Sequence, residues 1–361
     1  RDLESAIEPI ARLHTPLARL HAALRLVQRR LKTNVRELGQ RNTAHDFITR
    51  RGNRALLLKL LLDRLSIPNV LALVRPFSRL MQPAELPDPS VFEHPVLRVR
   101  LGTRTIWLDP AWIGAPLGYL MPGLQGRPAL LLSPFPRSPL DGSKTPTLAQ
   151  TPRGSIDDEG RTIVAAGHLE SSGQLALQVE ERLRGRVAVS YRRFLLSRGH
   201  EQRRKAIERV LRVWFPEAKL RKLEILDLQR NEKPLRLRYH ASGRLAPSIS
   251  LGFAGLYEIE ELSRVARRRQ ALLIENPRHV DLTIRLAVEP QLVVRHPTVQ
   301  TIVGPGLRFQ IADELTEGKG ITIRRRFVLR SGRLAPARYP ELLRGLRRII
   351  GIETISFERR R

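Results

Sequence analysis

The spacing of apolar residues predicts helices at the start of the chain. From Leu3 to about Leu38 the apolar positions recur at helical intervals, and Thr15 followed by Pro16 has the features of an N-cap and a first helical residue. A third helix is expected from about Asn53, because residues 55–62 (ALLLKLLL) are apolar on nearly every side. A helix of this kind is surrounded by protein, so we expect it to lie at the centre of a core.

Further along, the pattern changes to strands with a few helices among them. The runs with the spacing of strands are Val70–Val74, Pro95–Leu101, Arg104–Leu108, Leu235–Tyr239, Val280–Val288 and Ile321–Leu329. Helical spacing returns near residues 187–197, 201–215 and 340–350. No fixed-period repeat is present. The first region therefore reads as helices followed by antiparallel strands, and the second half as an α+β or β-sandwich-like domain with added helices.

A stretch rich in proline separates these two regions. Five prolines fall between Ser133 and Pro152, together with Gly, Ser and Thr and almost no periodic apolar pattern. Such a composition is typical of a linker or a long crossing loop.

The charge balance adds a possible class of ligand. The chain has 361 residues with 64 Lys and Arg against 35 acidic residues, a net charge of +29. A positive field of this size attracts phosphates, anionic lipid and acidic polymers, so one interpretation is a polyanion-binding surface of arginines. The other is an arginine-biased composition spread over solvated faces. Few aromatic residues (5%) are available for stacking on bases, and no nucleic-acid-reading motif stands beside the arginines.

The chain contains no cysteine, which excludes disulfides, cysteine-ligated zinc and every thiolate mechanism within it. Its longest apolar run, residues 55–62, is interrupted by Lys59 and is shorter than the roughly 20 residues of a membrane-spanning helix. We therefore expect no transmembrane segment. The chain opens at Arg1 rather than Met, so we expect it to be a processed or truncated piece.

One predicted hairpin places a histidine near an aspartate. A turn at Gly102-Thr103 suits a type II′ geometry, and it sets Val99 opposite Ile106 and Leu97 opposite Leu108 on one apolar face. The other face then carries His94, Val96, Trp107 and Asp109. In this register His94 and Asp109 are diagonal neighbours within reach of a side-chain hydrogen bond. A histidine oriented by a carboxylate is the base half of a nucleophilic triad, although such a pair at strand ends also occurs without any function.

The residues around this hairpin resemble a known family. The residues that carry the resemblance are Trp107-Leu108-Asp109-Pro110, residues 114–120 (GAPLGYL) and residues 124–132 (LQGRPALLL). They are similar to the His and Asp strands of the bacterial transglutaminase-like superfamily, in the branch with flanking domains of unknown function. The resemblance implies a papain-like α+β core, and it covers about residues 43–133. Together with the apolar pattern and the proline-rich stretch, it predicts four regions: a helical lead-in at 1–40, a transglutaminase-like core at 41–133, a Pro-rich linker at 134–155 and a β-rich C-terminal domain at 156–361.

The same resemblance indicates a lost nucleophile. Residues 51–54 (RGNR), leading into the apolar helix and then residues 67–75 (IPNVLALVR), are similar to the region in which the family has a Gly-x-Cys sequence at the helix start. The position of that cysteine matches Arg54. A guanidinium is not deprotonated in proteins and cannot form an acyl-enzyme. We expect Arg54 to contact Asp109 or another anion. Thr49 and Ser66 are nearby hydroxyls, but neither is placed at the helix start.

These observations predict a catalytically inactive transglutaminase-like protein that works as a protein-interaction or scaffolding module. Its degenerate triad would be Arg54, His94 and Asp109, with Trp107 in support, and the expected partner is an unidentified protein. The alternatives are a hydrolase or acyltransferase with a non-Cys nucleophile, and a polyanion-binding protein. No cofactor is expected, and no metal, because the nine histidines are dispersed; His45, His168, His200, His240, His279 and His296 are interpreted as surface or loop residues. The resemblance also implies a location at the bacterial envelope or periplasm.

Overall fold

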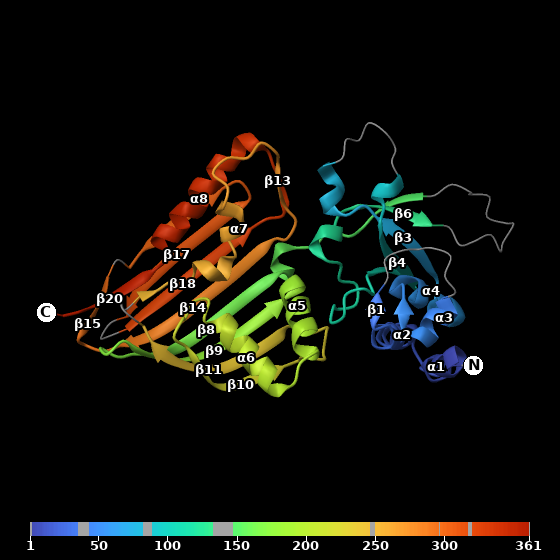
Figure 1. Cartoon of the computed structure of the whole chain (residues 1–361), viewed down its shortest axis with the longest axis horizontal. Helices are drawn as coiled ribbons and strands as arrows, with labels where there is room; N and C mark the ends of the chain where they lie inside the picture. The colour runs from blue at the N-terminus through green and yellow to red at the C-terminus, as the bar shows by residue number, and fades with distance from the viewer. Residues whose placement is uncertain are drawn as a thin grey trace. The chain divides into compact units, whose positions relative to one another are not determined.

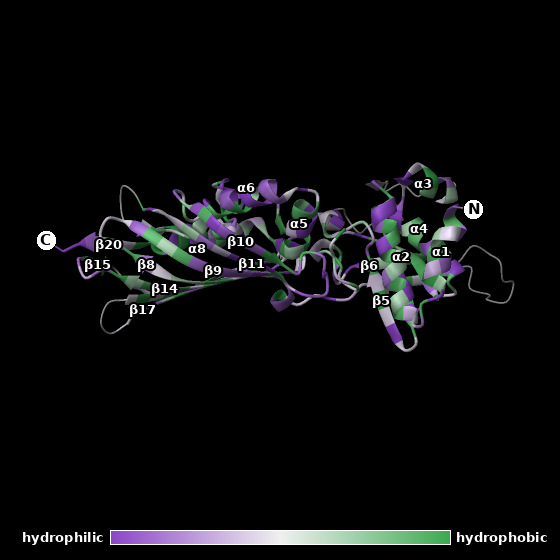
Figure 2. Ribbon diagram, turned by 90° about the horizontal axis from the view of Figure 1, so that it is seen from below, coloured by the Kyte–Doolittle hydropathy of each residue, from purple (hydrophilic) through white to green (hydrophobic). Residues whose placement is uncertain are grey.

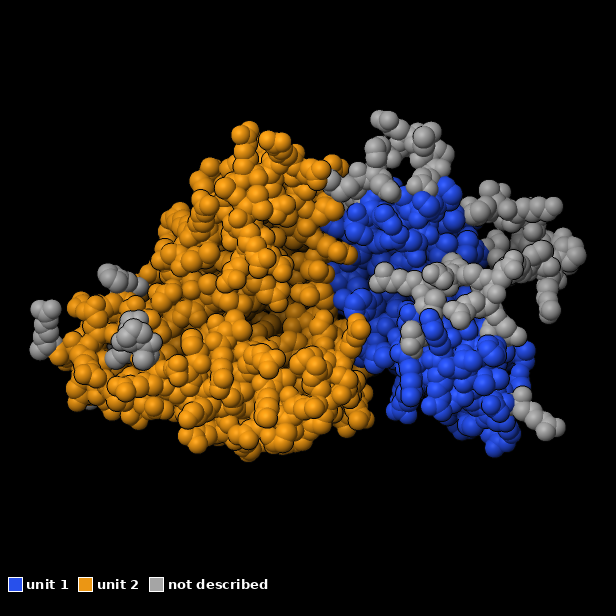
Figure 3. Space-filling view, viewed as in Figure 1, with its two compact units in different colours: residues 1–154 blue, residues 155–361 orange. Residues whose placement is uncertain are grey.

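A computed structural model describes residues 2–34, 43–81, 89–132, 147–245, 250–295, 297–316 and 320–360. The chain divides into two compact units, Arg1–Gly154 and Ser155–Arg361 (Figure 3). Most of the proline-rich stretch at 134–155 lies outside the described residues. Its residues Thr147–Gln150 form a strand of the first unit's sheet, so this part of the stretch belongs to that unit's fold. No helix in the described ranges is long and apolar enough to cross a membrane.

The first unit packs helices on one face of an antiparallel sheet (Figure 1). Its helices are α1 (Asp2–Ala11), α2 (Pro16–Arg30), α3 (Thr43–Thr49) and α4 (Arg54–Arg64). The sheet has the order β5-β4-β3-β6-β7, with β3 (Asn69–Val74), β4 (His94–Leu101), β5 (Arg104–Leu108), β6 (Pro128–Leu132) and β7 (Thr147–Gln150). The short strands β1 (Thr33–Asn34) and β2 (Arg51–Gly52) pair in parallel beside them.

Local sequence signals account for the helices of this unit. Thr15 caps α2 by accepting a hydrogen bond from the Ala18 amide, and Pro16 is the first helical residue, as predicted. The central helix begins after Asn53, whose side chain accepts from the amides of the first turn. Its leucines pack on apolar residues of α1, α2 and one face of the sheet. The helical lead-in is therefore part of the same core as the strands that follow it.

The second unit is built on one eight-stranded sheet. Its order is β10-β11-β9-β8-β14-β18-β17-β16, and neighbours are antiparallel except β8 and β14, which are parallel. The strands are β8 (Gly160–Leu169), β9 (Gln174–Arg184), β10 (Lys219–Leu226), β11 (Leu235–Arg244), β14 (Arg278–Val288), β16 (Val299–Gly304), β17 (Leu307–Thr316) and β18 (Gly320–Leu329). Shorter strands are β12 (Ser250–Leu251), β13 (Leu272–Ile274), β15 (Leu292–Arg295), β19 (Gly332–Leu334) and β20 (Ile355–Arg359).

Helices cover one face of this large sheet. They are α5 (Gly185–Leu196), α6 (His200–Leu211), α7 (Glu260–Ser263) and α8 (Tyr339–Ile352), and Figure 2 shows α5 and α6 on one side of the sheet. Their apolar side chains form a single cluster with alternate residues of the strands. We call the opposite face, which carries the other alternate residues, the outer face. In place of the two facing sheets expected of a sandwich, the unit has one large sheet covered by helices and smaller sheets. The described residues are thus mixed α+β, with several sheets and eight helices.

Candidate functional site

The β4–β5 hairpin has the register that the sequence predicted. Leu97 pairs with Leu108 and Val99 with Ile106, and these four side chains join the core under the helices. Gly102 has a φ of +58°, the positive value that the first central residue of a type II′ turn requires. Trp107 is buried on the other face, in a small cluster with residues that include Val96 and Leu124.

That register brings His94 and Asp109 together. His94 Nε2 lies 2.7 Å from Asp109 Oδ2, and the two side chains are 13% and 1% exposed. The second carboxylate oxygen, Oδ1, accepts a hydrogen bond of 3.0 Å from the Ala111 amide. Both oxygens of Asp109 are therefore engaged, which fixes the carboxylate and through it the imidazole ring.

Arg54 is the first residue of α4 and is 6% exposed. Its amide donates to Asn34 Oδ1 at 3.0 Å. Its guanidinium donates to two main-chain carbonyl oxygens, from Nη2 to Leu31 O at 2.7 Å and from Nη1 to Ala111 O at 3.1 Å. A positive charge at a helix N-terminus is unfavourable against the helix dipole, and these carbonyl oxygens offset that cost.

Residue 111 connects the three positions. The Ala111 amide donates to Asp109, and the Ala111 carbonyl accepts from Arg54. The sequence predicts a contact of Arg54 with Asp109 or another anion; in the structure its guanidinium donates to the Leu31 and Ala111 carbonyl oxygens, and Ala111 connects it to Asp109. The structure therefore gathers the predicted residues around the segment that follows β5.

Chemically, this site has an oriented histidine but a guanidinium at the helix start. The two hydroxyls considered as substitutes lie elsewhere. Thr49 Oγ1 donates to carbonyl oxygens of its own helix, His45 O at 3.1 Å and Asp46 O at 3.4 Å. Ser66 is an exposed residue just beyond the C-terminal end of α4, the end opposite Arg54.

One buried carboxylate near the site was not singled out from the sequence. Asp46 is 3% exposed and packs against Gly52, where an added Cβ would lie 2.3 Å from Asp46 Oδ2. Only glycine fits that close approach. The signal in the sequence was Gly52 itself, two residues before Arg54.

Among the described residues, no group of three or more His, Cys, Asp or Glu side chains is placed to hold a metal ion. The interpretation of His279 as a surface or loop residue is wrong. It lies on β14 with its side chain 12% exposed, and its Nε2 is 2.9 Å from Asp281 Oδ2. This hydrogen bond is the main cause that raises the pKa of His279, with burial opposing it.

Comparison with solved structures shows what the fold is similar to. The chain is similar to a candidate protease from Parabacteroides distasonis, with a TM-score of 0.53 and 10% sequence identity. The likeness covers 96% of this chain and 52% of that one, so the chain spans about half of that protein's length. At this identity the likeness concerns the fold alone. No protein-family model matches the chain, and no curated protein matches it in sequence.

The chain therefore has a fold similar to that of this candidate protease, and its 361 residues include no cysteine. A cysteine-protease mechanism is impossible with these residues.

Proposed function

We propose that the first unit is a catalytically inactive transglutaminase-like module and that the protein serves protein interaction or scaffolding. The observation that carries this proposal is the state of Arg54, which is buried at the head of α4 and hydrogen-bonded to Leu31 O and Ala111 O. In an active site of this class the same place needs a nucleophile that the histidine can deprotonate. A guanidinium held by main-chain carbonyl oxygens supplies neither a lone pair nor room for another group.

In this proposal His94 and Asp109 have a structural role. Their hydrogen bond of 2.7 Å fixes the start of β4 against the segment after β5, and Trp107 packs beside it. A buried polar pair that is fully hydrogen-bonded contributes to one defined arrangement of the surrounding chain.

A labelling experiment tests the loss of activity. The whole protein is treated with an acylating probe, and adducts are mapped by mass spectrometry, with the Arg54→Cys variant as the positive control. We expect no adduct on the native protein. An adduct on Thr49, on Ser66 or on another hydroxyl that disappears in His94→Ala would contradict the proposal and support a hydrolase or acyltransferase with a non-Cys nucleophile.

A binding role is supported by the terminal strand of the sheet in the second unit. Strand β16 is at one end of the eight-stranded sheet, and its side chains Val299 and Val303 are 80% and 70% exposed. Exposed edges with apolar side chains are suited to pairing with an extended segment of a partner protein. Chemical crosslinking in cells that produce the protein tests this. We expect the double variant Val299→Lys and Val303→Lys to yield less crosslinked partner protein than the native chain. The control variant Val164→Lys, on another strand of the same sheet, should yield the native amount. Equal capture by all variants would remove β16 from the proposal.

We also propose that this function is carried out at the bacterial envelope, as the resemblance implies. Fractionation of cells that produce the protein tests this location. Recovery in the cytosolic fraction alone would contradict it.

A further inference from the structure

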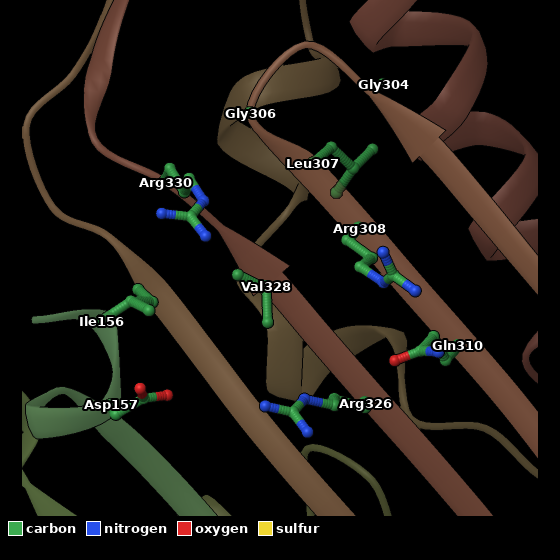
Figure 4. A pocket seen from close by; sticks show the side chains of 10 residues that line it. All are labelled: Ile156, Asp157, Gly304, Gly306, Leu307, Arg308, Gln310, Arg326, Val328 and Arg330. Atoms are coloured by element: carbon green, nitrogen blue, oxygen red, sulfur yellow. The ribbon is translucent and has the colours of Figure 1, made fainter.

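A hollow of about 610 Å³ opens in the second unit, on the outer face of the eight-stranded sheet (Figure 4). It lies where the β16–β17 turn and the end of β18 face the 3-10 turn η4 (Ile156–Asp158). Its charged side chains are those of Arg308, Arg326 and Arg330, with Asp157 on the opposite wall, and we call it the arginine hollow.

Strand register sets the three arginines beside one another. Arg308 pairs with Val328 and Gln310 with Arg326, so both arginines point to the outer face on adjacent strands. Gly306, with a φ of +68°, completes the turn between β16 and β17. Its carbonyl accepts a hydrogen bond of 2.8 Å from the Arg330 amide, which holds Arg330 at the rim of the hollow.

Elsewhere on the outer face, some arginines have acidic partners. Arg324 lies 2.8 Å from Glu314, and Arg238 lies 3.0 Å from Glu180. Within the described residues, neither Arg308 nor Arg330 makes a side-chain hydrogen bond or an ion pair. In the part of the chain that the structure describes, Arg308 and Arg330 therefore lack the acidic partners that Arg324 and Arg238 have.

The positive charge of the third guanidinium, that of Arg326, is only partly balanced by a carboxylate. Arg326 is 53% exposed and its Nε is 3.5 Å from Asp281 Oδ1, while the other oxygen of Asp281 lies 2.9 Å from His279. Three guanidiniums and the Asp157 carboxylate give the lining of the hollow a net charge of +2. Neighbouring like charges repel one another, so an anion placed between them is stabilised.

We propose that the arginine hollow binds a ligand through a phosphate group. The net charge of +2 matches a phosphate monoester dianion, whereas a single carboxylate would leave part of the charge unpaired. Guanidinium is planar and donates in pairs to phosphate oxygens, which makes arginine the preferred residue for such contacts. Asp157 and Gln310 lie on the walls of the hollow and are able to hydrogen-bond hydroxyl groups on the rest of the ligand.

Calorimetry on the full chain tests this site with glycerol 3-phosphate and with inorganic phosphate, at constant ionic strength set by chloride. We expect the combined Arg308→Gln and Arg330→Gln variant to bind glycerol 3-phosphate at least about tenfold more weakly than the native protein. Arg285→Gln is the matched control, because Arg285 is an exposed arginine on strand β14 of the same face. It should leave the affinity within about twofold of native, as expected of a distant exposed charge.

A second arm separates a soluble ligand from a lipid headgroup. Binding to phosphatidylcholine vesicles is measured with and without phosphatidic acid. If glycerol 3-phosphate does not bind but phosphatidic acid recruits the protein, and the double variant alone loses this recruitment, the phosphate is carried by a lipid. The proposal is overturned if neither probe binds better than chloride, or if the double variant binds as tightly as the Arg285→Gln control.

Discussion

Arginine side chains occupy both candidate sites of this protein, and they are in opposite states. In the first unit Arg54 is 6% exposed and donates to two main-chain carbonyl oxygens at the head of α4. In the second unit Arg308 and Arg330 are exposed beside a hollow, without an ion pair among the described residues. The partners of each guanidinium, rather than the residue type, separate a structural arginine from one that is available to a ligand.

The second unit also contains a buried arginine, so structural and exposed arginines occur within the same unit. Arg325 is hydrogen-bonded to Asp313 and to Glu353 O, and the Arg325 and Asp313 side chains are 1% and 2% exposed. It stands between Arg324 and Arg326, which point to the outer face. Three consecutive arginines therefore belong to two different environments within one strand.

The largest effect is expected where a buried guanidinium loses its counter-ion. Asp313→Ala should destabilise the second unit by about 3 to 5 kcal/mol, because Arg325 would remain buried and unpaired. Hydrogen exchange of the β17 and β18 peptides measures this change. Glu314→Ala, which removes the partner of the exposed Arg324, serves as the control and should cost about 1 kcal/mol or less.

A smaller effect is expected at the first unit's site. Arg54→Met keeps the apolar stem but leaves Leu31 O and Ala111 O without their charged donor, so we expect a loss of about 2 to 3 kcal/mol. Exchange of the α4 and β5 amides reports it. Protection equal to that of the native protein would show that Arg54 is not a structural arginine.

The stability of the second unit should depend on pH through the pair His279 and Asp281. The hydrogen bond to Asp281 is the main cause that raises the pKa of His279. Burial alone would raise the pKa of Asp281, but the hydrogen bond from His279 and the positive charges of His279 and Arg326 together lower it. The contribution of His279 to stability is present in full below about pH 6.5, the ordinary histidine value, and is lost as the pH rises through its raised pKa. The contribution of Asp281 is present above about pH 4 and is lost as the pH falls through its lowered pKa.

Unfolding by urea across this pH range checks the prediction. Stability of the second unit should decline above about pH 6.5, and the His279→Gln variant should lose that decline. The same decline in the variant would assign the pH dependence to another group.

The smallest effect should have the opposite sign. Without phosphate, Arg330→Gln should stabilise the second unit by about 0.5 kcal/mol or less, because it relieves repulsion with Arg308 and Arg326. With phosphate present the native protein should become the more stable of the two, since ligand binding stabilises the folded state. Arg285→Gln should show no such reversal on thermal denaturation.

The sequence predicted best the features that are set by residues close together along the chain. The Gly102-Thr103 turn fixed the hairpin register, and with it the contact of His94 and Asp109. Asn53 marked the start of α4. Strand alternation could also have placed Arg325 inward, because Ile323 and Phe327 on either side are apolar and buried.

What the sequence did not predict depends on residues far apart along the chain. The parallel pairing of β8 with β14 joins strands more than a hundred residues apart, and no local pattern specifies it. The arginine hollow likewise combines Asp157 with side chains from residues 304–330. Arg54 was placed at the helix start by the resemblance, but its carbonyl partners at Leu31 and Ala111 came only from the folded chain.

The thiol chemistry of an Arg54→Cys variant tests most directly that Arg54 stands at a lost nucleophile position. The rate of alkylation by iodoacetamide is measured against pH for Arg54→Cys and for Arg54→Cys with His94→Ala, after circular dichroism has shown that both are folded. We predict that the thiol pKa of the single variant lies below the ordinary value of about 8.5 and returns towards it in the double variant. A profile that is ordinary, or that does not change when His94 is removed, would contradict the account.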